Sequence, residues 1–376
     1  MTRHPVTPFA FATLIPLPLL VLGALWGGVW IAAAVLYLTL FALALDQVLA
    51  VADRAGAEGS EFPAADGLSA VLALAHLALV PLGVAAVAGA TGLGMGERVA
   101  AFFGFGLFFG QMSNSNAHEL IHRGQRGLFS LGQWVYISLL YGHHTTAHRL
   151  LHHRHVATPL DPNFPPKGMT FFRYFPRAWA GSFVQGFRAE QARLAARRDD
   201  GRGAKRRLNP YVIYVAGAAG FIALAYATLG WPGVAAYLGL AFYAQTQLVM
   251  SDYLQHYGLG RQQRPDGSYE AMGPQHSWNT PHWFSSAMMV NAPRHSDHHA
   301  NPQRPYPALR LPADQPMLPL SLPAMGIVAL VPPLWRRMMD RRVDRVLARA
   351  AAAATVAVSA AVPIAGATEG PAHNTV

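Results

Sequence analysis

Cysteine is absent from the 376-residue sequence, and charged residues make up only 13% of it. The lack of cysteine excludes disulfides, thiolate-bound zinc, haem–thiolate centres and built-in iron–sulfur or rubredoxin-type centres. A reaction that consumes electrons would therefore have to draw them from another protein. The scarcity of charge, together with 52% hydrophobic residues, is typical of a membrane protein rather than a soluble one.

Long apolar runs predict an all-α membrane protein with about six transmembrane helices, because a membrane-spanning helix needs roughly 20 apolar residues. The first run, residues 8–51, is long enough for two spans joined by a tight turn at Gly27 and Gly28. The other predicted spans are residues 68–90, 99–116, 210–229 and 232–254. Residues 128–142 are apolar but too short to cross comfortably, which predicts a helix lying along or dipping into the interface.

The remaining segments predict a histidine-rich helical cap on one membrane face. Residues 164–207 are aromatic and then rich in arginine, which favours a surface helix near lipid headgroups. The segment from 301 to 333 has many prolines, so a seventh span is not expected there, and a buried capping segment is. We predict one domain over residues 1–345, followed by an alanine-rich tail, 346–376, that begins as a surface helix and is partly disordered.

Positive charge indicates the orientation. The formal net charge is +10, and residues 118–208 hold fifteen Lys/Arg against five Asp/Glu. This basic block lies between apolar spans, where it favours retention on the cytoplasmic side rather than binding to nucleic acid. An even number of spans places both termini and all histidine clusters on that side. The prediction is an inner-membrane protein with its site facing the cytoplasm.

Nine histidines at helical spacings predict a metal site. Residues three or four apart share a helix face, so each cluster directs several imidazoles to one point. They are His118, His122, His148, His152, His153, His256, His295, His298 and His299. Imidazole suits iron, copper, zinc and nickel. Nine ligands exceed the roughly four to six that one ion accepts, which favours two ions.

Four carboxylates are candidates for fixing the imidazole tautomers from a second layer of contacts. They are Glu119, Asp161, Asp252 and Asp297. Five further histidines lie off the pattern and are expected to be second-layer or surface residues: His143, His144, His155, His276 and His282. His4, His76 and His373 are expected to have no part in metal binding.

The motifs closely resemble those of the integral-membrane alkane 1-monooxygenases. The resemblance is carried by His-Glu-Leu-Ile-His-Arg at 118–123, His-x-x-x-His-His at 148–153, Ala-Thr-Pro-Leu-Asp-Pro at 157–162, His-Tyr-Gly-Leu at 256–259 and Arg-His-Ser-Asp-His-His-Ala at 294–300. Asn-Pro-x-Arg-Pro-Tyr at 301–306 is similar to the family's continuation of the last motif.

The resemblance implies a non-haem di-iron enzyme in which the nine histidines bind two Fe ions. It implies use of O2 to hydroxylate the terminal carbon of medium- or long-chain n-alkanes to primary alcohols. Electrons would come from rubredoxin and its NAD(P)H-dependent reductase. The hydrophobic substrate would enter from the bilayer, and Phe102, Phe103, Phe105, Phe108 and Phe109 are candidate channel residues that also suit packing or lipid contact.

Two departures and several alternatives stay open. Family members often have Glu where this chain has Ala147 and Gln255. A xylene- or cymene-type methyl hydroxylase is the nearest alternative. A fatty-acyl desaturase or hydroxylase of the same histidine-box group is less favoured, because desaturases typically have His-x-x-His-His in their later motifs. A metal transporter or a haem-binding bundle would need polar or paired histidines inside the spans, and His76 is almost alone there.

Overall fold

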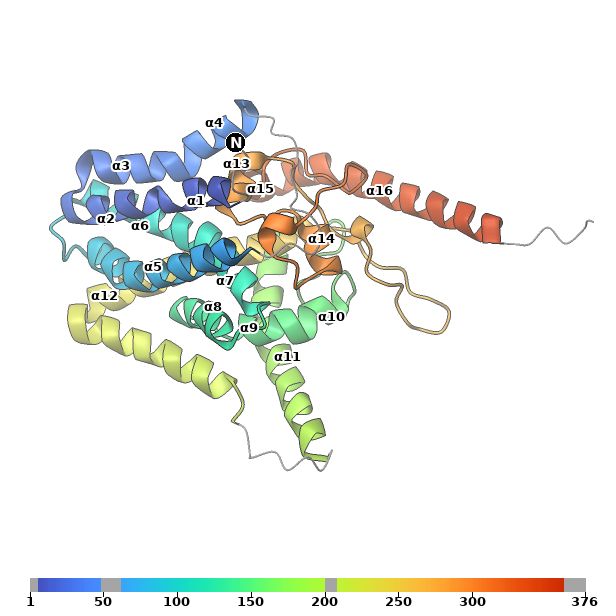
Figure 1. Cartoon of the computed structure of the whole chain (residues 1–376), viewed down its shortest axis with the longest axis horizontal. Helices are drawn as coiled ribbons and strands as arrows, with labels where there is room; N and C mark the ends of the chain where they lie inside the picture. The colour runs from blue at the N-terminus through green and yellow to red at the C-terminus, as the bar shows by residue number, and fades with distance from the viewer. Residues whose placement is uncertain (1–5, 49–61, 200–207, 362–376) are drawn as a thin grey trace, which may run out of the picture.

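The computed structural model describes residues 6–48, 62–199 and 208–361, and this part of the chain is helical without a β-strand (Figure 1). Two isolated β-bridges, Gln263–Tyr269 and Asn279–Met317, are the only strand-like pairings within those ranges. The predicted all-α membrane fold is confirmed.

Four helical segments are long and apolar enough to cross a membrane. They are Thr7–Trp26, Gly28–Gln47, Pro63–Ala88 and Tyr211–His256. The first two contain α1 (Thr7–Leu14), α2 (Pro16–Trp26), α3 (Gly28–Leu36), η1 (Tyr37–Phe41) and α4 (Ala42–Val48), and the others are α5 (Pro63–Ala88) and α12 (Tyr211–His256).

Two glycines reverse or break these segments as predicted. Gly27, between α2 and α3, and Gly230, within α12, both have a φ of 61°, which glycine adopts without a clash of Cβ. Gly230 divides α12 into two arms (Figure 1). These arms match the fifth and sixth predicted spans in position, while the count of six spans stays a prediction.

The fourth predicted span is a helical run in three pieces. It consists of α6 (Met95–Leu107), the π-helical turn η2 (Phe108–Ser113) and α7 (Asn114–Ile121). This run is not among the four long apolar segments. Its last two pieces contain Gln111 and the polar sequence from Ser113 to Asn116. The run nevertheless packs among the apolar helices, against α3, α5 and α12.

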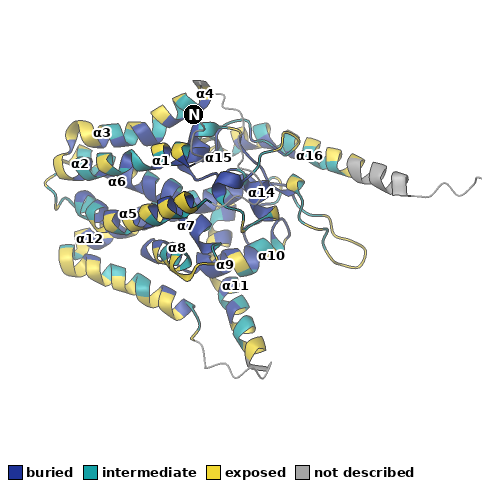
Figure 2. Ribbon diagram, in the orientation of Figure 1, coloured by how far each residue is buried: buried dark blue, intermediate teal, exposed yellow. Residues whose placement is uncertain are grey.

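The outer faces of the long helices are apolar and exposed (Figure 2). Examples are Trp26, Val29, Leu40, Trp231 and Phe242, all more than half exposed. A monomeric soluble protein seldom exposes so much apolar surface, which suits contact with lipid. The α2–α3 turn and the bend of α12 lie at the left-hand end of Figure 1, away from α14. Trp26 and Trp231 adjoin those turns, where tryptophan typically marks a membrane interface.

Helices between the long apolar segments occupy the region predicted as the cap. They are α8 (Arg126–Ser138), α9 (His144–Ala147), the π-helical turn η3 (His148–His152), α10 (His153–His155) and α11 (Phe171–Asp199). The helices predicted at 128–142 and 164–207 are both present, and residues 200–207 lie outside the described ranges. Helix α8 packs closely on α7 and α5, and its position along the membrane interface stays a prediction.

The C-terminal part continues the cap. Its elements are η4 (Pro274–His276), α13 (Trp283–Met288), α14 (His295–Ala300), η5 (Tyr306–Ala308), α15 (Leu322–Ala329) and α16 (Pro332–Ala361). The proline-rich segment forms only η5 and α15, in keeping with the prediction that it does not span the membrane. Helix α16 continues through the predicted domain boundary at 345–346. The disorder predicted for the end of the tail concerns residues 362–376, which lie outside the described ranges.

Candidate metal centre

Elements far apart in the chain bring the nine predicted histidines together. Helix α7, the η3–α10 segment, the end of α12 and α14 each contribute at least one of them. They form two groups, and the nitrogen atoms offered within each group all lie within 4.8 Å of one another. The first group is His118, His122, His148, His153 and His298, and the second is His152, His256, His295 and His299. Every histidine of the predicted set belongs to one or the other of these two groups.

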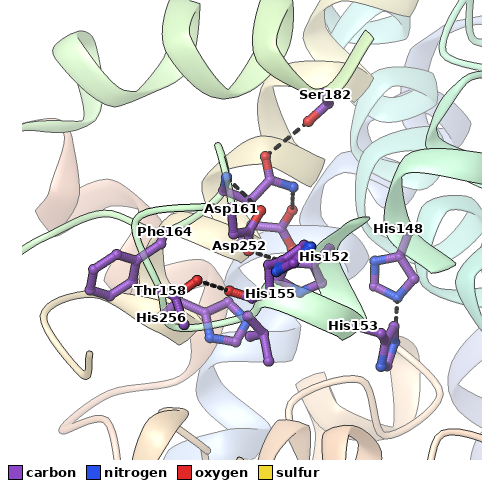
Figure 3. A network of polar contacts seen from close by, with 12 residues as sticks. His148, His152, His153, His155, Thr158, Asp161, Phe164, Ser182, Asp252 and His256 are labelled. Carbon is purple, nitrogen blue, oxygen red and sulfur yellow. Dashed lines mark hydrogen bonds and ion pairs between the residues drawn. The ribbon is translucent and has the colours of Figure 1, made fainter. Parts of the chain in front are cut away.

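Helix geometry explains how neighbouring histidines reach different groups. A π-helical turn bonds residue i to i+5, and η3 carries His148 to the same group as His153, while His152 points to the other (Figure 3). In α14, His295 and His299 are four residues apart and share a face. His298, next in sequence to His299, is directed to the first group.

The ring nitrogens converge so closely that hydrogen bonds between the histidines cannot satisfy all of their lone pairs. Nε2 of His148 lies 2.7 Å from Nε2 of His118 and 2.9 Å from that of His153. In the second group Nε2 of His295 lies 2.9 Å from Nε2 of His256 and 3.0 Å from that of His299.

A neutral imidazole has one donor and one acceptor, so such clusters leave lone pairs facing each other. Nε2 of His122 and of His152 are buried without any hydrogen-bond partner among the described residues. Two groups of converging imidazole nitrogens fit two transition-metal ions.

Electrostatics keeps most of these imidazoles in the neutral form that binds metal. Burial, reinforced by the neighbouring histidines, holds the pKa of His148 and His298 well below its usual value. The same causes lower the pKa of His153 and His299. A neutral imidazole offers a lone pair to a metal ion without first losing a proton.

One carboxylate of the predicted second layer bonds a histidine directly. Nδ1 of His152 lies 2.7 Å from Oδ2 of Asp161 (Figure 3). Burial lowers the pKa of His152, but Asp161 more than offsets this, so the pKa lies above its usual value. The amide of Asn163 donates to Asp252 at 3.0 Å and accepts from the Ser182 hydroxyl. Asp252 thus belongs to the same buried network without a hydrogen bond to a histidine among the described contacts.

The other two carboxylates bond arginines and backbone amides instead of imidazoles. Glu119 accepts from Arg123 at 2.6 Å and from the backbone N–H of Tyr306 at 3.1 Å. Asp297 accepts from Arg304 at 2.5 Å and from the backbone N–H of Arg310 at 2.8 Å. Both therefore fasten histidine-bearing helices to the loop that follows α14.

Further contacts were not visible in the sequence. Nδ1 of His256 donates to the backbone carbonyl of His276 at 3.4 Å, and a backbone acceptor leaves no signal in a motif. The ring of His144 lies 5.0 Å from that of His148. His143 packs on Tyr141 instead.

The other off-pattern histidines lie outside both groups. His155 and His282 are partly exposed, and the side chain of His276 bonds Glu270. His76 bonds Ser138 within the bundle. His4 and His373 lie outside the described ranges.

A cavity of about 470 Å³ leads from the apolar helices to the histidines. Most of its lining comes from the second long segment, the α6–α7 run, α12 and α15, and it includes one histidine of each group, His118 and His295. Of the five predicted channel phenylalanines, Phe103 lines it. Phe105, Phe108 and Phe109 are instead buried in the core, because they face the neighbouring helices, and Phe102 stacks on Tyr243.

Comparison with known proteins agrees with this geometry. The fatty acid desaturase family matches residues 97–326, which contain all nine histidines. Alkane 1-monooxygenase 1 of Pseudomonas aeruginosa is 33% identical over 277 residues, covering 72% of this chain and 72% of the relative. The chain belongs to the alkane 1-monooxygenase family. Alkane 1-monooxygenase of Acinetobacter baylyi is 35% identical over 61% of this chain and 55% of its own length.

A more distant relative bears on the alternative function. The hydroxylase component of xylene/toluene monooxygenase from Pseudomonas putida is 26% identical, over 58% of this chain and 57% of that protein. The identity to this relative is lower than to both alkane 1-monooxygenases. The similarity therefore favours the alkane 1-monooxygenases over the methyl hydroxylases.

Both departures from the alkane 1-monooxygenase pattern have a structural setting. Ala147 is buried in α9 and packs closely on α11. A Cβ atom added at Gly186 of α11 would lie 3.0 Å from Cβ of Ala147. Gln255 donates through Nε2 to the carbonyl of Ala292 at 3.0 Å and accepts from the hydroxyl of Ser251. It thereby joins the end of α12 to the loop before α14, a contact that needs the amide N–H and that a carboxylate would not make.

Proposed function

We propose that this protein is a membrane monooxygenase that hydroxylates the terminal carbon of medium- or long-chain n-alkanes to primary alcohols. One observation carries the proposal: a cavity bounded by apolar helices ends at His118 and His295, one member of each histidine group. A hydrocarbon dissolved in the bilayer would reach the histidines without crossing water. Membership of the alkane 1-monooxygenase family supports the same reaction.

We infer that two Fe ions occupy the two histidine groups. The five-histidine group would hold one ion and the four-histidine group the other. When bound, the irons would supply the redox chemistry that activates O2 for insertion into a C–H bond. The protein's own residues orient the ligands: Asp161 fixes His152, and the His276 carbonyl fixes His256.

The reaction needs an external electron donor, because the chain has no cysteine with which to bind an iron–sulfur or rubredoxin-type centre. Rubredoxin with its NAD(P)H-dependent reductase is the donor that we propose. We propose that the histidines lie on the cytoplasmic face of the inner membrane, and the basic residues between the fourth and fifth predicted spans support this through the positive-inside rule.

Hydroxylation of an aromatic methyl group is the second candidate, supported by the similarity to the xylene/toluene monooxygenase component. The cavity does not by its shape exclude a ring. The two functions differ in their products, so competition between octane, hexadecane and xylene distinguishes them.

The test is metal analysis combined with product analysis of the purified, reconstituted protein. We expect about two irons per chain and a primary alcohol formed only when O2, reductase and rubredoxin are all present. Omitting each component in turn is the control. A protein with full iron content that oxidises xylene and leaves both alkanes unchanged would overturn the alkane proposal and favour the methyl hydroxylase.

A further inference from the structure

The helix that carries His118 presents one narrow accessible face. Within residues 104–121 the half-buried positions are Leu107, Gln111, Ser115 and His118, and the other positions are buried. Their spacings of four, four and three residues place them on a single helix face. All four line the cavity. A ligand in the cavity therefore meets Leu107 first, then two polar side chains, then a histidine.

Those two polar side chains have no hydrogen-bond partner among the described residues. The neighbouring Asn114 is different, because its amide donates to the carbonyls of Gly110 and Ala244 at 3.0 and 2.9 Å. The polar side chains opposite, on α12, each make at least one hydrogen bond, although Oε1 of Gln247 has no partner among the described residues. Gln247 donates to the carbonyl of Gly106, and Ser251 donates to Gln255. Gln111 and Ser115 thus offer an amide and a hydroxyl without a partner on one face of the cavity. Oδ2 of Asp46 and Oγ of Ser285, which belong to other elements of the lining, also lack a partner among the described residues.

A hydrocarbon cannot satisfy this pair. Covering an amide or a hydroxyl with methylene groups removes its bonds to water and returns none, which is unfavourable. A ligand with a hydroxyl group returns them, since a hydroxyl both donates and accepts. Ser115 lies about 4.5 Å and Gln111 about 10 Å from His118 along the helix axis, at 1.5 Å per residue. Ser115 is therefore within a few ångströms of the histidine end of the cavity, and Gln111 lies about two helical turns away from it.

We propose that Ser115 and Gln111 form a hydroxyl-binding subsite for primary alcohols inside the cavity. This inference rests on the proposed function, because its natural ligand would be the alcohol product. The alcohol oxygen accepts from the Ser115 hydroxyl or the Gln111 amide, and its O–H donates to Oε1 of Gln111. Such bonding moves the new hydroxyl group away from His118 and makes the cavity prefer a long-chain alcohol to the parent alkane.

The test measures binding without turnover. Iron-loaded protein in lipid nanodiscs, without reductant, is titrated with dodecane and with 1-dodecanol for the native chain and for Ser115→Ala and Gln111→Leu. Each variant should reduce the preference for dodecanol over dodecane by about fivefold, the factor expected for one lost neutral hydrogen bond. Leu107→Ala is the matched control on the same face, and it should weaken both ligands by the same factor.

A conservative variant protects the test from a folding artefact. Ser115→Thr keeps the hydroxyl and should keep the preference for dodecanol, provided that iron content and melting temperature match the native protein. An unchanged preference in both Ser115→Ala and Gln111→Leu would overturn the subsite. Because no reaction occurs, this result is independent of whether the protein hydroxylates alkanes. A lack of octanol production with reductase and rubredoxin present would instead count against the proposed function.

Discussion

Nδ1 of His152 lies 2.7 Å from Oδ2 of Asp161, and the two side chains are only 1% and 0% exposed. The other carboxylate oxygen, Oδ1, accepts the backbone N–H of Asn163 at 2.9 Å. A carboxylate accepts hydrogen bonds, so Nδ1 carries the proton and Nε2 of His152 is left with its lone pair. That lone pair is directed to the four-histidine group, where it has no partner among the described residues.

Asp161→Asn should therefore weaken metal binding in one group more than in the other. An asparagine has one acceptor where Asp161 uses two, so either His152 or Asn163 loses its bond. Changes to such orienting partners typically cost about 10–100-fold in metal affinity or activity. We expect the four-histidine group to lose iron first. Iron content during dialysis against a weak chelator, followed by Mössbauer spectroscopy, measures this.

The matched control is Asp266→Asn, the same substitution on an exposed loop. The Asp266 side chain there bonds Ser268 and, within the part of the chain that the structure describes, no histidine. This variant should retain iron as the native protein does. Equal retention of iron in the Asp161 and Asp266 variants would show that Asp161 has no orienting role.

The sequence predicted which histidines gather because histidine spacing is a local property, while their role as metal ligands stays a prediction. The spacings of α7 and α14 assign imidazoles to one helix side, and every predicted histidine lies in one of the two groups. The division into five and four was not predictable, since it depends on the π-helical turn η3, which has no residue signature. The backbone donors that bond Glu119 and Asp297 were also missed, because they come from a loop that approaches the two helices only in three dimensions.

His298→Ala and His299→Ala should affect different metal ions although the residues are adjacent. His298 belongs to the five-histidine group and His299 to the four-histidine group. Each variant should abolish turnover, and each should bind about one iron per chain, with different iron spectra. His299→Ala removes one of four ligands, whereas His298→Ala removes one of five. The iron of the four-histidine group should therefore be lost more completely from His299→Ala than the iron of the five-histidine group from His298→Ala.

His155→Ala is the control for these variants, because His155 lies beside the second motif but in neither group. It should retain both irons and membrane insertion. An active His298→Ala variant with two irons would remove that residue from the metal site.

Gly132→Ala should destabilise the protein by separating α8 from α7. A Cβ atom at Gly132 would lie 2.8 Å from Cβ of Leu120 and 2.9 Å from the backbone oxygen of Ala117. Neither atom moves without shifting α7, which carries His118. Overpacking of this kind costs roughly 1–3 kcal/mol. Thermal unfolding in detergent and iron retention should both fall.

Gly127→Ala is the control on the same helix, because nothing lies within 4 Å of a Cβ atom at that position. Alanine favours a helix by up to about 1 kcal/mol over glycine, so this variant should be as stable as the native protein or more stable. A Gly132→Ala variant with native stability would contradict the close packing of α7 and α8.

The spans were easier to predict than the cavity between them. Gly27 and Gly230 mark the turns because their positive φ demands glycine, and apolar length marks the helices around them. Aromatic residues do not reveal in the same way which face they occupy. Phe103 lines the cavity while Phe105 is fully buried in the core two residues later. The rotation of the helix about its axis decides which phenylalanine faces the cavity. That rotation depends on packing partners that are distant in the sequence.

Ala100→Trp should shorten the alkanes that the protein accepts. Ala100 lines the cavity and lies about 27 Å from His118 along the helical run, at 1.5 Å per residue. An indole there fills the remote end, where only a long chain reaches. Hexadecane oxidation should fall about tenfold, in keeping with the roughly 1–3 kcal/mol cost of overpacking, while octane oxidation is retained.

The control is Val99→Trp, because Val99 is 50% exposed and does not line the cavity. Gas chromatography of mixed-alkane incubations gives both rates, and a parallel fall for octane and hexadecane would show that Ala100 does not limit chain length.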